Sequence, residues 1–386
     1  MVNLIHQNRQ INHLQLFNIG GGNSAFKQSF LDTGIRALIG DVIRVVVHPS
    51  VRWRNGSGQE VNANGQDDNG ASSQLSAPYP SDKGERNKYF IKADNLSFPD
   101  GALVGTWDNG ETFIPIGQYG EFCVTSDLDL WQPAKDSTFK LAVWGNGASD
   151  TKSNAPQGNL AIFHGEGTQR YSQAHYNNPD FWIDSADYNP DRQGGAFLID
   201  AQVHNINNGS DDNGKRILKQ TGIQCKVGDI ITIVIDFQDD WNIMDNYPTH
   251  PCGYLKSHGG AYHRHSFRND IRVNHFSHAC GAVVGTFDTG DWKQRSYFPV
   301  GHYLKMTVLK DGELTLMHWD CDYGNNSGIL TAYVTTNHYN GFKGFHNGNQ
   351  SLDLRSWGWD GTFFHPVGHP KEGNKGHWKN GNWVTD

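Results

Sequence analysis

The chain is poor in charge, and the charge that it carries is negative overall. Only 19% of its 386 residues are charged, the formal net charge is -8, and no run of basic residues occurs. Because nucleic-acid binding depends on a positively charged face, this composition excludes a nucleic-acid partner.

Long hydrophobic runs are missing as well. No stretch of 18 apolar residues occurs, so we expect no membrane-spanning helix. The first nine residues (MVNLIHQNR) lack the apolar segment of a secretory signal peptide. We therefore expect a protein that is cytoplasmic on synthesis and that reaches other places only by a signal-free route.

Cysteines are few, odd in number and scattered, and no CxxC motif occurs. This argues against a disulfide framework and predicts thiols in a reducing compartment. The five are Cys123, Cys225, Cys252, Cys280 and Cys321.

Glycine and aromatic residues are abundant instead, with 45 Gly, 12 Trp and 12% aromatic residues in all. Helical proteins contain less glycine, whereas aromatic side chains suit pleated sheets. No segment keeps a 3.6-residue apolar period, so we predict an all-β protein. Residues 303–308 and 313–318 flank Asp311-Gly312, and this dipeptide predicts a hairpin between them.

An internal repeat organises the chain. Residues 33–43 (TGIRALIGDVI) resemble residues 221–231 (TGIQCKVGDII), and a tryptophan, Trp53 or Trp241, stands 13 positions after the turn glycine in each. Four blocks in one order indicate a duplication. The other three pairs are 100–107 with 280–287, 114–117 with 298–301, and 138–144 plus 160–163 with 314–319 plus 329–334.

The repeat predicts two tandem antiparallel β-sandwich domains. The first copy covers residues 15–165 and the second covers residues 196–336. Residues 166–195 are polar with Asn-Pro and Gly-Gly breakers, and we interpret them as a linker or embellishment. Residues 337–386 form a tail rich in Gly and aromatic residues, to which the sequence assigns no fold.

The densest polar motif is the loop 320–328 (DCDYGNNSG) in the second copy. Its side chains Asp320, Asp322, Asn325 and Asn326 offer only oxygen donors, between two β-forming runs. Hard oxygen ligands in a flexible loop suit calcium. Asp, Asn and Gly also dominate ordinary turns, so an Asx-rich turn is the alternative.

Three blocks of the second copy carry a family resemblance: GDIITIV at 228–234, CGAVV at 280–284 and YGNNSG at 323–328. Together they resemble the bacterial calcium-dependent galactophilic lectins, typified by Pseudomonas lectin A, with a weaker likeness in the first copy. The resemblance implies a jelly-roll-like lectin sandwich, no enzymatic activity, and one Ca²⁺ that binds galactose directly through two hydroxyls.

The resemblance also implies a ligand set. Asp320, Asn325 and Asn326 would bind calcium through side chains, with backbone carbonyls near Asp322 and at Trp241 completing the site. The stretch between Asp320 and Asn325 is two residues shorter than in the family, and Asp322 adds a second carboxylate. Added ligand charge strengthens calcium binding.

The sugar contacts follow from the same resemblance. The family uses a histidine and an amide upstream of the CGAVV block, where this chain has a larger insert at 258–272. An aromatic ring, from Trp241 or Tyr323, would pack on the apolar face of the sugar. The candidates in the insert are His263, His265, Asn269 and Asp270.

The first copy departs from the pattern. Its loop 145–155 lacks the Asp after the Trp and the Asn-Asn pair, and it holds Lys152. We predict that this copy has lost or altered its calcium site. A single sugar site binds weakly, so we expect a homo-oligomer that engages galactosides on glycoconjugates through several sites.

Three other interpretations stay open. Zinc could bind His275, His278 and Cys280 together with His263 and His265. A glycoside hydrolase could use two carboxylates of the group Asp236, Asp239, Asp240 and Asp245. The third interpretation is a lectin-like assembly subunit of a larger secreted particle or toxin complex.

Overall fold

The computed structural model describes most of both copies. The described residues are 11–37, 39–47, 51–73, 90–91, 98–107, 110, 113–125, 138–145, 151–152, 160–165, 193–206, 218–235, 240–244, 247–256, 262–266, 272–273, 276–290, 295–320, 324–337, 376–379 and 382–385.

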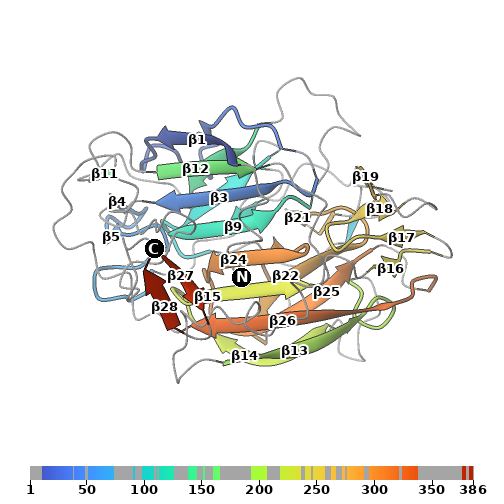
Figure 1. The fold of residues 1–386 in the computed structure, drawn as a ribbon. Coiled ribbons are helices and arrows are strands. Elements are labelled where there is room, and N and C mark those ends of the chain that lie inside the picture. The colour runs from blue at the N-terminus through green and yellow to red at the C-terminus, as the bar shows by residue number, and fades with distance from the viewer. Residues whose placement is uncertain are drawn as a thin grey trace.

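The described part of the chain consists of strands and connecting turns, which confirms the all-β class (Figure 1). Of the strand pairs, one is parallel, between β6 (Phe90–Ile91) and β20 (Arg272–Val273), and the others are antiparallel. No described segment is a helix of the length and apolarity that crossing a membrane requires.

One eight-stranded antiparallel sheet runs through both copies, from β1 at the top of Figure 1 to β13 at the bottom. The four strands of the first copy fill one side and those of the second copy fill the other, in mirrored order. In order across the sheet, the strands are β1 (Ile11–Phe17), β12 (Leu160–Gly165), β3 (Val42–Val47), β9 (Tyr119–Cys123), β24 (Tyr303–Thr307), β15 (Ile230–Ile235), β26 (Ile329–Asn337) and β13 (Gln193–Asp200).

The two copies meet where β9 pairs with β24. Phe122 lies opposite Leu304 and Glu121 lies opposite Lys305 in this register. The copies are therefore joined by a continuous sheet, an arrangement that a reading as two tandem domains does not predict. The boundaries at 165 and 196 stay predictions, since residues 166–192 lie outside the described ranges.

Each copy adds a four-stranded sheet of its own, which packs against its half of the large sheet. Apolar residues alternate along these strands and fill one cluster that draws on both copies, with Ile43 and Leu141 from the first and Ile233 and Leu316 from the second. The sheets are β2 (Leu31–Asp32), β10 (Lys140–Val143), β7 (Leu103–Thr106), β8 (Ile114–Pro115), and β14 (Lys219–Cys225), β25 (Gly312–Trp319), β22 (Ala282–Asp288), β23 (Tyr297–Pro299).

The tryptophans of the repeat make the same contact in both copies. Trp53 donates from Nε1 to the carbonyl of Gly101 at 2.7 Å, and Trp241 donates to that of Gly281 at 2.8 Å. Both glycines have φ near +90° (92° and 85°), a conformation that other residues rarely adopt. Matching contacts at matching positions agree with the duplication that the sequence indicates.

The predicted hairpin around Asp311-Gly312 is wrong. β24 pairs with β9 and β15 in the large sheet, whereas β25 pairs with β14 and β22 in the second sheet. The turn thus carries the chain from one layer of the sandwich to the other. Asp311 stabilises this crossing, because its carboxylate accepts a hydrogen bond from the backbone N–H of Val227 at 2.8 Å.

Small sheets complete the described structure. The sheet nearest the predicted site belongs to the segment between β15 and β22 and contains β16 (Trp241–Asn242), β17 (Pro248–Thr249), β18 (Tyr254–Lys256) and β19 (Tyr262–Ser266). The other small sheets are β4 (Arg52–Arg54), β5 (Glu60–Val61) and β11 (Thr151–Lys152); β6 and β20 with β21 (Phe276–Ser277); and β27 (Gly376–Lys379) with β28 (Asn382–Thr385).

Candidate functional site

The polar loop 320–328 begins at the end of β25 and leads into β26. Asp320, its first residue, is buried, and its Oδ1 accepts a hydrogen bond from the thiol of Cys280 at 3.1 Å. A buried carboxylate is costly unless charge or hydrogen bonds compensate it. Asp320 is therefore not a solvated turn residue.

Asn326 is also buried, and its amide is oriented by His318. The side-chain nitrogens of Asn326 and Asn205 lie 3.3 and 3.1 Å from Nδ1 of His318. An amide nitrogen can only donate, so Nδ1 is the acceptor. With its nitrogen held in this way, Asn326 directs Oδ1 elsewhere, and this buried oxygen has no hydrogen-bond partner among the residues that the structure describes.

Trp241 and the loop are brought together by backbone pairing. Asn242 donates to the carbonyl of Ser327 at 2.7 Å, and Ser327 donates back to that of Asn242 at 3.1 Å. A Cβ on Gly328 would come within 2.9 Å of the Cβ of Trp241, so the close approach depends on glycine. The Trp241 ring meets His318 edge to face, with centroids 4.2 Å apart.

The predicted stacking of Trp241 on a sugar is wrong. Its side chain is fully buried, because the indole packs under the loop and donates to Gly281. Its carbonyl accepts a long hydrogen bond of 3.3 Å from Thr249 Oγ1, and the two residues are partners in the β16–β17 pair. The role of Trp241 as a backbone ligand stays a prediction.

The other predicted residues are only partly described. Asn325 is exposed. His263 and His265 lie in β19, of which the structure describes the backbone, and β19 pairs with β18. Asp322, Tyr323, Asn269 and Asp270 lie outside the described residues.

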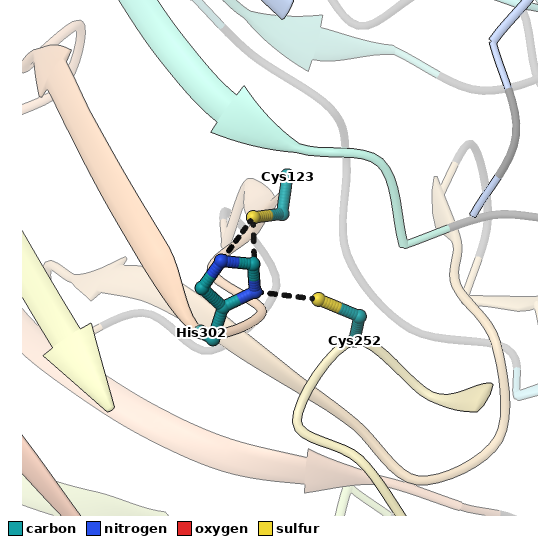
Figure 2. Close-up of side chains that lie close together, drawn as sticks. All are labelled: Cys123, Cys252 and His302. Atoms are coloured by element: carbon teal, nitrogen blue, oxygen red, sulfur yellow. Dashed lines mark hydrogen bonds between the residues drawn. The ribbon is translucent and has the colours of Figure 1, made fainter. Parts of the chain in front are cut away.

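Of the residues in the zinc interpretation, the structure describes the side chains of His278 and Cys280, which have different partners. His278 contacts Thr125 through Nδ1 at 2.8 Å and meets the ring of Trp319, whereas Cys280 donates to Asp320. His275 lies outside the described residues. Within the described ranges, a different group could hold a metal ion, namely Cys123, Cys252 and His302 (Figure 2).

Sequence reasoning missed His318, Asn205 and the contact of Cys280 with Asp320. His318 precedes Asp320 by two positions, and the alternation of a strand places both on one face. That periodicity could have found His318. Nothing local could have found Asn205, which lies 113 positions from its partner.

Burial lowers the pKa of both His278 and His318 to about 3. At neutral pH both imidazoles are therefore uncharged, and His318 places no positive charge beside Asp320 and Asn326. A cation in the loop would not be repelled by it.

These histidines predict a loss of stability in acid. An unfolded histidine has a pKa of about 6.5, so between about pH 6.5 and pH 3 the unfolded chain binds more protons than the folded chain. Each histidine then lowers the unfolding free energy by up to about 1.4 kcal/mol per pH unit as the pH falls. Above about pH 6.5 their contribution is complete and constant.

His278→Asn tests this, because asparagine can keep a contact with Thr125 Oγ1 but does not titrate. We expect the slope of unfolding free energy against pH, measured by urea denaturation between about pH 6 and pH 4, to fall by about 1.4 kcal/mol per unit. Comparing slopes removes any constant cost of the smaller side chain. An unchanged slope would show that His278 is already protonated in the folded protein.

Comparisons with known proteins give little. No protein-family model matches the chain, and no curated protein matches it. The chain is similar to the N-terminal domain of EclA, a PllA-like lectin, with 21% identity over 38% of this chain and 98% of that domain, at a TM-score of 0.24. It is also similar to the STIV MCP, with 8% identity over 80% and 91% of the two chains, at a TM-score of 0.13. At these low TM-scores, neither similarity establishes a fold or a function for this chain.

Proposed function

We propose that the protein is a non-enzymatic, calcium-dependent lectin of galactose type, with its binding site in the second copy. The observation that carries this is the convergence of loop 320–328 with Trp241, which places two buried oxygen-bearing side chains, Asp320 and Asn326, at one end of the sandwich. The proposal extends to galactosides and glycoconjugates as partners.

The donor set fits calcium. Asp320 supplies negative charge, Asn326 supplies a buried amide oxygen with no hydrogen-bond partner in the described part of the chain, and exposed Asn325 supplies a further oxygen. Calcium binds six to eight oxygen ligands and tolerates irregular geometry. Sulfur and imidazole ligands would favour other metals, and Nδ1 of His318 is engaged by the side-chain amides of Asn205 and Asn326.

The residues of this chain have distinct roles in the proposal. His318 orients Asn326, Cys280 orients Asp320, and Gly328 lets the loop approach the backbone of Trp241. When bound, calcium supplies the positive centre to which two sugar hydroxyls bind. The exposure of Asn325 leaves the outer side of the loop open to a sugar, and several copies of the chain would be needed for strong attachment.

The test is a glycan array probed with and without EDTA. We expect binding of galactosides in calcium and its loss in EDTA, while Asp320→Asn loses binding without the chelator. Asp68→Asn is the matched control, since Asp68 is an exposed carboxylate that pairs with Arg52 in the first copy. For wild type and control, calcium at a hundredfold excess over Kd should add about 2.7 kcal/mol to the unfolding free energy.

Two results would contradict the proposal. Galactoside binding that EDTA does not affect would remove calcium from the mechanism. Release of reducing sugar from galactosides would indicate a hydrolase, since a lectin cleaves no glycosidic bond.

A further inference from the structure

A group of two thiols and one imidazole lies at the junction of the two copies. Cys123 is the last residue of β9, and His302 immediately precedes β24, its partner strand. Cys252 comes from the segment between β17 and β18. Figure 2 shows the two sulfur atoms beside the His302 ring, each joined to it by a dashed line. All three side chains are buried.

The distances are those of a shared coordination sphere. Nδ1 of His302 lies 3.4 Å from Sγ of Cys123 and 3.1 Å from Sγ of Cys252, and the ligand atoms of the three residues lie within 4.8 Å of one another. Tetrahedral Zn²⁺, with Zn–S near 2.3 Å and Zn–N near 2.0 Å, separates its sulfur and nitrogen ligands by roughly 3.5 Å.

Glycine makes this approach possible. A Cβ on Gly301, which has φ of 58°, would come within 2.9 Å of the Cβ of Cys123 and 3.0 Å of Sγ of Cys252. The turn that presents His302 is therefore pressed directly against both cysteines, and no larger residue would fit there.

The internal repeat provides a second copy of this arrangement, around Gly117, in which the three surrounding residues are not metal ligands of this kind. Gly117 corresponds to Gly301, and the residues around it in the equivalent places are Gln118, Thr307 and Asn64. The last assignment follows from matched bridges, Asn64 to Ala102 and Cys252 to Ala282. A Cβ on Gly117 would press against Asn64 and Thr307, as one on Gly301 would against the cysteines.

At that equivalent place, Asn64 and Thr307 make ordinary hydrogen bonds. Asn64 Oδ1 accepts from the backbone N–H of Gln118 at 2.7 Å, and Thr307 Oγ1 accepts from that of Tyr119 at 3.2 Å. The fold thus accepts an amide, an amide and a hydroxyl here. Around Gly301, the three equivalent residues are two cysteines and a histidine, whose side chains are metal ligands. A purely structural role does not require these residue types.

We propose that Cys123, Cys252 and His302 bind one Zn²⁺ ion that ties the two copies together. Thiolate and imidazole are ligands that select zinc over calcium or magnesium. Two thiolates balance the charge of the ion, so the site can be buried without net charge. Three protein ligands leave a fourth position, which Zn²⁺ fills with water.

The convergence of the two sulfur atoms on one imidazole supports this assignment. Both lie within 3.4 Å of Nδ1, and that of Cys123 also lies 3.7 Å from Nε2. One ion bound by Nδ1 and both sulfur atoms accounts for this convergence. Because the ligands are buried, we expect the ion to be taken up as the chain folds and retained during purification.

The experiment measures zinc in untagged protein by elemental mass spectrometry. Wild type should carry one more zinc per chain than the triple variant Cys123→Thr, Cys252→Asn, His302→Gln. This variant copies residues that the equivalent place already accommodates, so it should fold. Cys225→Ser, at a buried thiol outside the group, should keep the full zinc content. Equal zinc in wild type and the triple variant overturns the proposal.

Cobalt tests the same ligands without any variant. Wild type expressed in cobalt-supplemented minimal medium should show a thiolate-to-cobalt charge-transfer band in the near ultraviolet, and the triple variant should lack it. No band in wild type, or a Cys123–Cys252 disulfide found by peptide mass spectrometry, overturns the proposal. The lectin proposal is unaffected by either result, since galactoside binding at loop 320–328 is measured separately.

Discussion

Glu121→Gln is expected to destabilise the protein by about 3–5 kcal/mol, because it removes the charge of a buried carboxylate from between buried cations. Arg44 donates to Glu121 at 3.0 Å, and both side chains are almost fully buried. Across the junction of the copies, Lys305 lies in register with Glu121 and is also buried. Tyr119 donates to the second carboxylate oxygen at 2.9 Å.

The pKa of Arg44 shows the strength of this environment. Burial is the largest influence and acts to lower that pKa, but the charge and hydrogen bond of Glu121, together with Tyr119 and Tyr303, outweigh it, so that the pKa is raised. Glutamine keeps the shape and one acceptor but leaves the guanidinium without its counter-charge. The buried charges of Arg44 and Lys305 would then be uncompensated, which costs far more folding free energy than the same loss at a surface.

Urea denaturation measures the effect, with Asp68→Asn as the control. Asp68 pairs with Arg52 at 2.8 Å but is 75% exposed, so its loss should change stability by less than about 1 kcal/mol. A similar, small loss in Glu121→Gln would mean that water reaches the Arg44–Glu121 pair and that it contributes little to joining the copies.

Trp241→Ala and Trp53→Ala should each destabilise the protein by about 3–5 kcal/mol, as expected for a fully buried tryptophan. Each change also removes the indole N–H that binds Gly281 or Gly101. The two residues occupy equivalent places, so their effects on stability should be similar. The stabilisation of the two variants by calcium should differ.

The difference follows from the contacts of Trp241 with His318 and Gly328. Without the indole, His318 loses its packing and the loop loses its support, so calcium should no longer stabilise Trp241→Ala. Trp53→Ala should keep the calcium response of wild type. Denaturation curves with calcium and with EDTA measure both quantities. Loss of the response in both variants, or in neither, would place the calcium site outside loop 320–328.

Local pattern predicted the class of fold and the repeat. Blocks such as 228–234 contain short apolar segments bounded by glycine turns. Such segments are typical of strands, because a strand buries their side chains in a sheet. The same signal failed at Asp311-Gly312, where turn chemistry was read correctly but the partner strands were not. Which strand pairs with which depends on neighbours, here β9 and β15, that are distant in sequence.

The candidate site divides in the same way. Asp320, Asn325 and Asn326 could be named from the sequence, because oxygen donors crowded in one loop indicate their chemistry without any knowledge of the fold. The burial of the Trp241 ring could not be predicted from the sequence, since the exposure of a side chain depends on how the whole molecule packs. Nor could Asn205, whose hydrogen bond to His318 spans 113 positions.

The sequence by itself determined an all-β chain with a duplicated pattern and an oxygen-rich loop, because strand periodicity, turn chemistry and donor type are local properties. Tertiary structure alone decided that both copies share one sheet, that Glu121 lies between Arg44 and Lys305, and that Cys123 meets His302 across 179 positions. The physical reason is that β-sheets form by pairing between distant segments. Contacts between side chains are fixed only when that pairing, and the packing of the layers, is complete.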